Sequence, residues 1–95
     1  MNQDVIKKEL ISLLAELFTD TGIDTDLFEY VDLIDDLGMD SVTFISIIVE
    51  VEARFGITVP DDKLLMEEFK NVDSIISIVL NELNEKSNAE GNAYV

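Results

Sequence analysis

Apolar residues recur at helical spacing near both ends of this 95-residue chain, and this periodicity restricts the fold more than any other feature. In residues 3–18, the apolar positions that share one face of a helix are Ile6, Leu10, Leu13, Leu14 and Leu17. The second such segment follows Asn71, a favourable N-cap residue, and its apolar face comprises Val72, Ile75, Ile76, Val79, Leu80 and Leu83. We therefore expect two helices whose apolar faces form a shared core.

The segment 41–55 combines features of a strand and of a helix. Its sequence SVTFISIIVEV is rich in β-branched residues, which favour strands. Its length favours a helix, as does an apolar stripe that comprises Phe44, Ile48, Val51 and Phe55. Asp40 is placed to accept N–H bonds as the N-cap, and Gly56 stands where a C′ residue belongs. We predict a helix over 41–55.

The remaining segments complete an all-α prediction. Residues 19–40 indicate a long loop between the first and second helices. The residues expected to anchor this loop to the core are Leu27, Phe28, Val31, Leu33, Ile34 and Leu37. A short helix is expected near residues 62–66, and residues 84–95 lack periodicity and are predicted to be a flexible C-terminal tail. The predicted fold is a small four-helix bundle, with three longer helices and one short one, in a single domain of residues 1–83.

The charge is strongly unbalanced. There are 21 acidic and 6 basic residues, which gives a net charge of −15, and no Lys or Arg occurs between Lys8 and Arg54. Such a surface repels phosphate backbones and anionic headgroups. We therefore expect no nucleic-acid or membrane partner, and we expect protein partners with basic docking patches.

The composition also excludes several kinds of chemistry. Without Cys the chain has no disulfide, thiolate nucleophile or Cys-ligated metal, and without His it has no Ser–His mechanism. The N-terminal MNQDVIKKEL lacks the apolar region of a signal peptide, and no apolar run approaches the ~20 residues of a membrane span. We expect a cytoplasmic monomer that is not an enzyme and has no metal site.

The stretch DDLGMDSVTF, residues 35–44, places one serine at the predicted start of the second helix. The Ser41 hydroxyl would lie beside unsatisfied backbone N–H groups and the positive end of the helix dipole, which favours a phosphate there. Gly38 lets the backbone turn without a side chain in the way of an incoming enzyme or prosthetic group. An Asp-Ser pair at a helix start is also a common capping arrangement, so the dipeptide alone leaves both interpretations open.

The wider pattern resembles the acyl carrier and peptidyl carrier protein family. The family has Leu-Gly-x-Asp-Ser at the start of a helix that closes on Glu-x-x-Phe, followed by Gly or Asp, Ile and Pro. The matching residues in this chain are Leu37, Gly38, Asp40, Ser41, Val42, Glu52, Phe55, Gly56, Ile57, Val59 and Pro60. The resemblance covers about residues 6–83 and implies that residues 1–83 form a carrier domain.

This resemblance implies that a phosphopantetheinyl transferase attaches 4′-phosphopantetheine to Ser41. The thiol of that arm would hold acyl or aminoacyl groups as thioesters, and the other partners would be enzymes that load, modify and transfer this cargo. Asp40 is similar to the family's aspartate beside the attachment site, with capping and transferase recognition as its implied roles. Val42, Ser46 and Ala53 depart from fatty-acid-type carriers, which indicates a specialised polyketide, nonribosomal peptide or related pathway, with fatty acid synthesis left open.

A second stripe on the serine helix consists of Val42, Ile45 and Val49, off the predicted core stripe. The resemblance implies that these positions dock onto partner enzymes or guard the entry to an acyl-binding interior, and the alternative is that they are core. Acidic residues expected to join this docking surface are Asp35, Asp36 and Glu50.

Two alternatives of another class rest on the acidic residues alone. The loop before the serine is rich in Asp, yet no window has the order of an EF-hand, which leaves weak cation binding as one alternative. The other is a non-covalent acidic protein-interaction module in which Ser41 only caps a helix.

Overall fold

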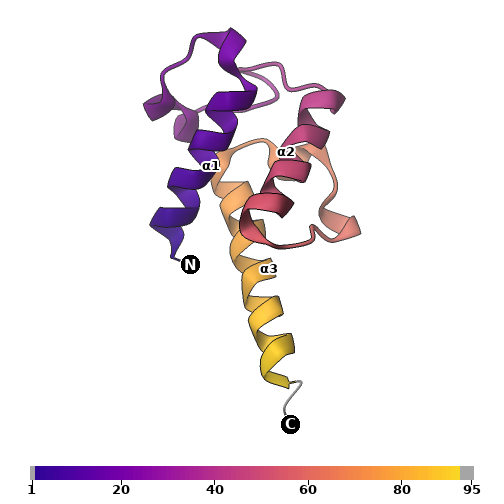
Figure 1. Ribbon diagram of the computed structural model, residues 1–95. Helices are drawn as coiled ribbons and strands as arrows, with labels where there is room; N and C mark the ends of the chain where they lie inside the picture. The colour runs from indigo at the N-terminus through magenta and orange to yellow at the C-terminus, as the bar shows by residue number, and fades with distance from the viewer. Residues whose placement is uncertain (1, 93–95) are drawn as a thin grey trace.

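The computed structural model describes the backbone of residues 2–92 and the side chains of residues 2–86. Its three α-helices are α1 Gln3–Leu17, α2 Ser41–Phe55 and α3 Val72–Asn92. Its short 3₁₀ segments are η1 Thr19–Thr21, η2 Thr25–Tyr30, η3 Asp61–Lys63 and η4 Met66–Phe69. The described residues form no strand, and the all-α bundle predicted from the sequence is confirmed (Figure 1).

Side-chain caps start all three α-helices. The Asn2 side chain accepts the Val5 N–H at 2.9 Å, and Asn71 accepts the Ser74 N–H at 2.8 Å. Asp40 does the same for α2, where it accepts the Thr43 N–H at 2.9 Å. Each cap satisfies one of the backbone N–H groups that the first turn leaves without a helical partner, as the sequence predicts for α2 and α3.

The C-terminus of α2 is also as predicted. Gly56 has a left-handed backbone, with φ of 63°, and its N–H donates to the Glu52 carbonyl at 3.0 Å. The Glu52 side chain accepts the Val59 N–H at 2.9 Å, which holds the extended segment that follows. A left-handed residue at this position ends a helix without strain only when it has no Cβ.

The core lies where α1 packs against both α2 and α3. Its fully buried members from the helices include Ile6, Leu10, Leu13, Leu14, Ile47, Val51, Val72, Ile75 and Val79. From the long loop, Phe28 and Leu33 are fully buried, while Leu27 is exposed. The remaining predicted loop anchors are partly buried against the core, and these are Val31, Ile34 and Leu37.

Two sequence predictions need correction. On α2 the fully buried residues are Ile47, which the predicted stripe omits, and Val51. Phe44 and Ile48 are partly buried and pack against the edge of the core. The short helix predicted near 62–66 is two 3₁₀ segments, η3 and η4, separated by Leu64 and Leu65. Short connections of this kind often adopt the tighter 3₁₀ geometry.

The helix α3 continues to Asn92, past the residue at which the predicted tail begins, and it projects past α1 and α2 (Figure 1). A polar segment can extend a helix that packing has already nucleated, because each added residue gains an intrahelical hydrogen bond. Residues 93–95 of that tail lie outside the described residues. The domain boundary at residue 83 and the flexibility of the tail stay predictions.

Ion pairs join elements that are distant in sequence. Lys7 of α1 pairs with Glu29 of η2, and this hydrogen-bonded contact raises the pKa of Lys7 and lowers that of Glu29. On α2, the Arg54 guanidinium lies 2.8 Å from a carboxylate oxygen of Glu16 and 3.7 Å from one of Glu9, both on α1. Within residues 2–92, no helix is both long and apolar enough to cross a membrane.

Candidate functional site

Two aspartates shape the loop that precedes Ser41. The Asp32 carboxylate accepts the N–H groups of Ile34 and Asp35, each at 2.8 Å, and starts a helical turn. The Asp36 carboxylate reaches back and accepts the Asp32 N–H at 2.8 Å. Sequence reasoning missed Asp32, although its position before an apolar, helix-like stretch is the same capping signal that identified Asp40.

Backbone hydrogen bonds connect this loop to the rest of the fold. The Leu33 N–H donates to the Lys70 carbonyl at 2.6 Å, directly after η4, and the Met39 N–H donates to the Leu33 carbonyl at 2.8 Å. Leu33 and Met39 are both buried. The loop therefore positions the start of α2 against η4.

Gly38 makes the turn into α2. Its φ of 67° lies in the left-handed region, and a Cβ added there would meet no atom within 4 Å. Conformation rather than crowding therefore favours glycine. The space directly beside the Gly38 backbone is open.

Ser41 is the first residue of α2, and its side chain is exposed. The capping function belongs to Asp40, whose carboxylate accepts the Thr43 N–H. This backbone bond and, after it, the Thr43 hydroxyl hold the pKa of Asp40 below its ordinary value. The Ser41 hydroxyl is thus presented to solvent at the positive end of α2, and a neighbour performs the capping.

The stripe Val42, Ile45 and Val49 is exposed by 74%, 59% and 57% respectively. The alternative that these residues belong to the core is wrong. They follow the exposed Ser41 along one side of α2, which is an unusual concentration of exposed aliphatic surface on one short helix. Asp35 and Asp36 are exposed in the loop that precedes α2. Glu50 of α2 is half-buried, and its carboxylate oxygen lies 3.6 Å from the Arg54 Nε.

Comparison with known proteins places this geometry in a family. A family model described as a phosphopantetheine attachment site matches residues 8–79, which include Ser41. The chain belongs to the acyl carrier protein family.

Acyl carrier proteins from three bacteria show the extent of the similarity. The chain is 35% identical over 71 residues to one from Myxococcus xanthus, which covers 73% of this chain and 84% of that protein. It is also 35% identical over 71 residues to one from Micrococcus luteus, which covers 73% of this chain and 82% of that protein. To one from Acidothermus cellulolyticus it is 31% identical over 77 residues, which covers 79% of this chain and 89% of that protein. The family resemblance inferred from the sequence is confirmed.

Members of this family are carriers and not catalysts, and they hold 4′-phosphopantetheine covalently. Their partners are phosphopantetheinyl transferases and biosynthetic enzymes. The start of α2 in this carrier fits such a group, because it combines an exposed hydroxyl, an independent cap and open space at Gly38.

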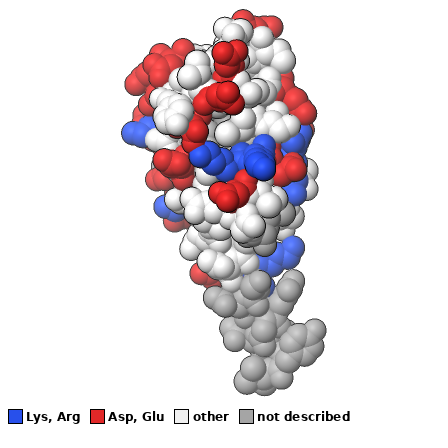
Figure 2. Space-filling model, turned by 90° about the vertical axis from the view of Figure 1, so that its left-hand side faces the viewer, with Lys and Arg blue, Asp and Glu red and all other residues white. Residues whose placement is uncertain are grey.

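The charge of the carrier is distributed unevenly. On the face shown in Figure 2, acidic side chains are spread over the end of the molecule that bears the long loop, and Lys and Arg lie further down, mixed with more acidic side chains. A basic surface on a partner would be attracted to the acidic end and oriented by it.

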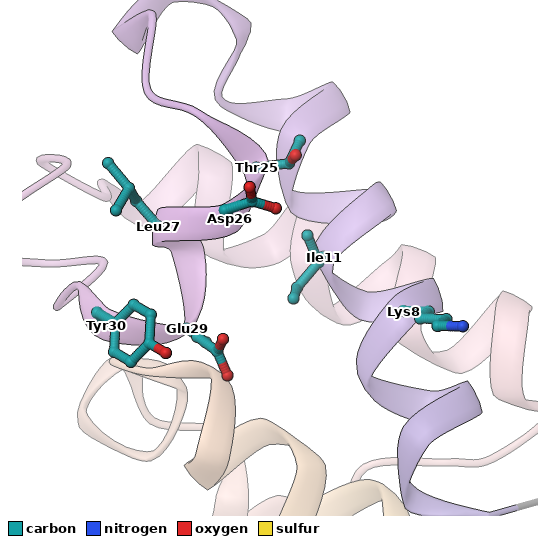
Figure 3. Close-up of a pocket in the computed structure, with 7 residues that line it drawn as sticks. All are labelled: Lys8, Ile11, Thr25, Asp26, Leu27, Glu29 and Tyr30. Carbon is teal, nitrogen blue, oxygen red and sulfur yellow. The ribbon is translucent and has the colours of Figure 1, made fainter.

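A surface hollow of about 480 Å³ lies away from the start of α2, between α1 and η2 (Figure 3). Its lining residues are Lys8, Ile11, Thr25, Asp26, Leu27, Glu29 and Tyr30. None of these is a predicted site residue.

Two aspartates of the acidic loop have a structural role. Among the described residues, no group of three or more carboxylates is arranged to hold a metal ion. Asp32 and Asp36 use carboxylate oxygens to accept backbone N–H groups, which is a structural role. The density of aspartates is thus partly explained by the construction of the loop.

Proposed function

We propose that Ser41 carries the 4′-phosphopantetheine arm of this acyl carrier protein. The observation that supports this most directly is that Asp40 caps α2, which leaves the neighbouring Ser41 hydroxyl exposed within the region that matches the family. A serine needed for capping would instead direct its oxygen at the N–H groups of the first turn. When bound, the arm supplies the thiol that holds an acyl or aminoacyl group as a thioester.

The attachment is a phosphoryl-group transfer without redox change. The Ser41 oxygen forms a bond to the phosphorus next to the pantetheine of coenzyme A, the bond from that phosphorus to the bridging oxygen breaks, and adenosine 3′,5′-bisphosphate leaves. The hydroxyl proton passes to a base or to water in the active site of the transferase. The N-terminus of α2 stabilises the phosphodiester that remains on Ser41.

We assign supporting roles to two neighbours of Ser41. Asp40 holds the first turn of α2 in shape and presents a carboxylate to the transferase, consistent with its exposure and lowered pKa. Gly38 keeps the approach open and supplies the left-handed turn.

The docking surface in this proposal joins the exposed stripe Val42, Ile45 and Val49 to the carboxylates of Asp35, Asp36 and Glu50. The aliphatic side chains supply apolar area at the centre of the contact, and the carboxylates attract basic partner patches. The partners are the transferase and the enzymes that load, modify and transfer the cargo.

We further propose a specialised pathway for this carrier, such as polyketide or nonribosomal peptide synthesis. This rests on Val42, which stands where fatty-acid-type carriers typically have Leu. It also rests on Ser46 and Ala53, which stand where those carriers have acidic residues, so the acidic face of α2 is thinner. A cytoplasmic location and a monomeric state complete the proposal.

The test is intact mass before and after incubation with coenzyme A, Mg²⁺ and a promiscuous phosphopantetheinyl transferase. We expect one phosphopantetheine on the parent chain, none on Ser41→Ala, and one on Ser46→Ala. Ser46 is the matched control because it is another serine of α2, with its hydroxyl donating to the Val42 carbonyl at 3.1 Å. A folded parent chain that gains no mass would overturn the proposal and favour the non-covalent acidic module.

A further inference from the structure

One guanidinium, that of Arg54, contacts three carboxylates near the end of α2. Its Nη2 donates to Glu16 at 2.8 Å, and its Nη1 lies 3.7 Å from an oxygen of Glu9. Its Nε faces the third carboxylate, that of Glu50, at 3.6 Å. The Arg54 side chain is only 24% exposed, against 45% for that of Glu50, so water and salt screen the cation less than the carboxylate that it holds.

The carboxylates nearer to Ser41 have no such cation. Among the side chains of residues 2–86, no Lys or Arg pairs with Asp35, Asp36 or Asp40. All three aspartates are exposed. The negative potential of the docking surface is therefore stronger at the end near Ser41 than beside Glu50.

The dimensions of α2 place Glu50 within reach of a partner that docks around Ser41. Glu50 and Arg54 lie nine and thirteen residues after Ser41, which corresponds to about 14 Å and about 20 Å along the helix. A standard interface covers about 800 Å² on each partner, equivalent to a disc of about 16 Å radius. A contact centred on Ser41 therefore includes Glu50 and has Arg54 at its rim. Arg54 is too far from Ser41 to touch the reacting atoms, so it would act on docking and not on the chemical step.

We infer that Arg54 is a specificity-determining residue, because it competes with partner cations for Glu50 and directs the basic patch of a partner to the carboxylates nearer Ser41. The inference rests on the proposed attachment at Ser41. A partner cation opposite Glu50 meets the like charge of Arg54 and a carboxylate that is already engaged. A cation opposite Asp35 or Asp36 meets neither cost. The partner that fits has its basic groups beside its active-site entrance and an apolar surface along the rest of α2.

The experiment measures kcat and KM for a promiscuous phosphopantetheinyl transferase with a basic docking patch, at low salt and at about 0.5 M NaCl. Arg54→Gln should lower KM for the carrier roughly 2- to 5-fold at low salt, with kcat unchanged, and high salt should remove the difference. Lys7→Gln is the matched control, because it removes the same charge and releases Glu29 of η2, which lines the hollow away from the start of α2. It should leave KM within about 1.5-fold of the parent.

A double-mutant cycle tests whether Arg54 acts through Glu50. In the parent, Glu50→Gln should raise KM by less than about 2-fold, because Arg54 already holds that carboxylate. In the Arg54→Gln chain the same substitution should raise KM roughly 3- to 6-fold. Asp35→Asn should raise KM by a similar factor in both chains, since no cation holds Asp35. A purely structural role of Arg54 would lower the melting temperature without making Glu50 more important for docking.

The outcomes separate this inference from the proposed function. Equal changes in KM for Arg54→Gln and Lys7→Gln would mean that only net charge matters, and equal effects of Glu50→Gln in both chains would mean that Arg54 and Glu50 are not coupled. Either result would overturn the inference while leaving Ser41 as the attachment site. A parent chain that gains no arm would overturn both. Arg54→Met, which keeps the packing of the apolar stem, replaces Arg54→Gln if that chain does not fold.

Discussion

Ile45 and Ile47 provide a direct test of which face of α2 holds the fold together and which meets partners. They lie two residues apart, about 200° around the helix axis, and Ile47 is fully buried while Ile45 is exposed. Replacing Ile47 with Ala removes three buried carbon atoms, at about 0.8 kcal/mol each, and leaves a cavity. We expect Ile47→Ala to lower the free energy of unfolding by roughly 3–4 kcal/mol.

The same substitution at Ile45 should have little effect on stability. We expect a change within about 0.5 kcal/mol, because the side chain is largely in water and Ala has the higher helix propensity. The function of Ile45 should change instead, with the transferase kcat/KM falling roughly 5- to 30-fold if Ile45 is a central docking contact. Ile47→Ala, assayed where it is still folded, should keep most of this activity.

Urea denaturation followed by far-ultraviolet circular dichroism measures the stabilities, and intact mass over time measures attachment of the arm. Similar losses of stability in the two variants would refute the assignment of the faces of α2. A stable Ile45→Ala protein modified at the parental rate would leave the stability argument intact and refute Ile45 as a docking residue.

Three further predictions concern charge. Arg54→Ala should lower the free energy of unfolding by roughly 1 kcal/mol at low salt, because Glu9, Glu16 and Glu50 lose their shared cation, and Arg54→Lys should recover part of the loss in thermal melts. Salt or divalent cations should raise the melting temperature of the parent by screening the charge of −15, and a flat response would contradict this. Because folding lowers the pKa of Asp40, its ionised carboxylate contributes to the free energy of unfolding above the pKa that the group has in the unfolded chain. This contribution is lost as the pH falls through the pKa of the folded state, below about pH 4. Asp40→Asn keeps an N-cap that does not titrate, so its melting temperature should fall less than that of the parent between pH 6 and pH 3, and equal falls would refute the linkage.

Local signals predicted the elements around Ser41 well. Asp40 and Gly56 marked the two ends of α2 correctly, since capping depends on the chemistry of a few adjacent residues. The same local logic placed the start of α3 after Asn71. It failed at the end of α3, because a polar helical extension has no apolar stripe to reveal it.

The division of α2 into faces was only partly predictable. Periodicity separated Val42, Ile45 and Val49 from the core, and their exposure confirms that separation. Periodicity assigned Phe44 and Ile48 to the buried face, although they are only partly buried, and it left Ile47 out of that face. Neighbouring positions on a largely apolar helix have similar hydrophobicity, so periodicity cannot rank their burial. The packing of α1 and η4 determines which of them is covered.

The sequence by itself determined the three α-helices, the serine at the start of one of them, the acidic surface and the family to which the chain belongs. These follow from spacing, capping chemistry and composition, which are properties of neighbouring residues or of the whole chain. Only the tertiary structure decided that Phe44 meets Phe69, that Leu33 bonds to Lys70, and that Arg54 joins α2 to α1. Such contacts join residues far apart in the chain, and they depend on how the helices pack, which no local pattern specifies.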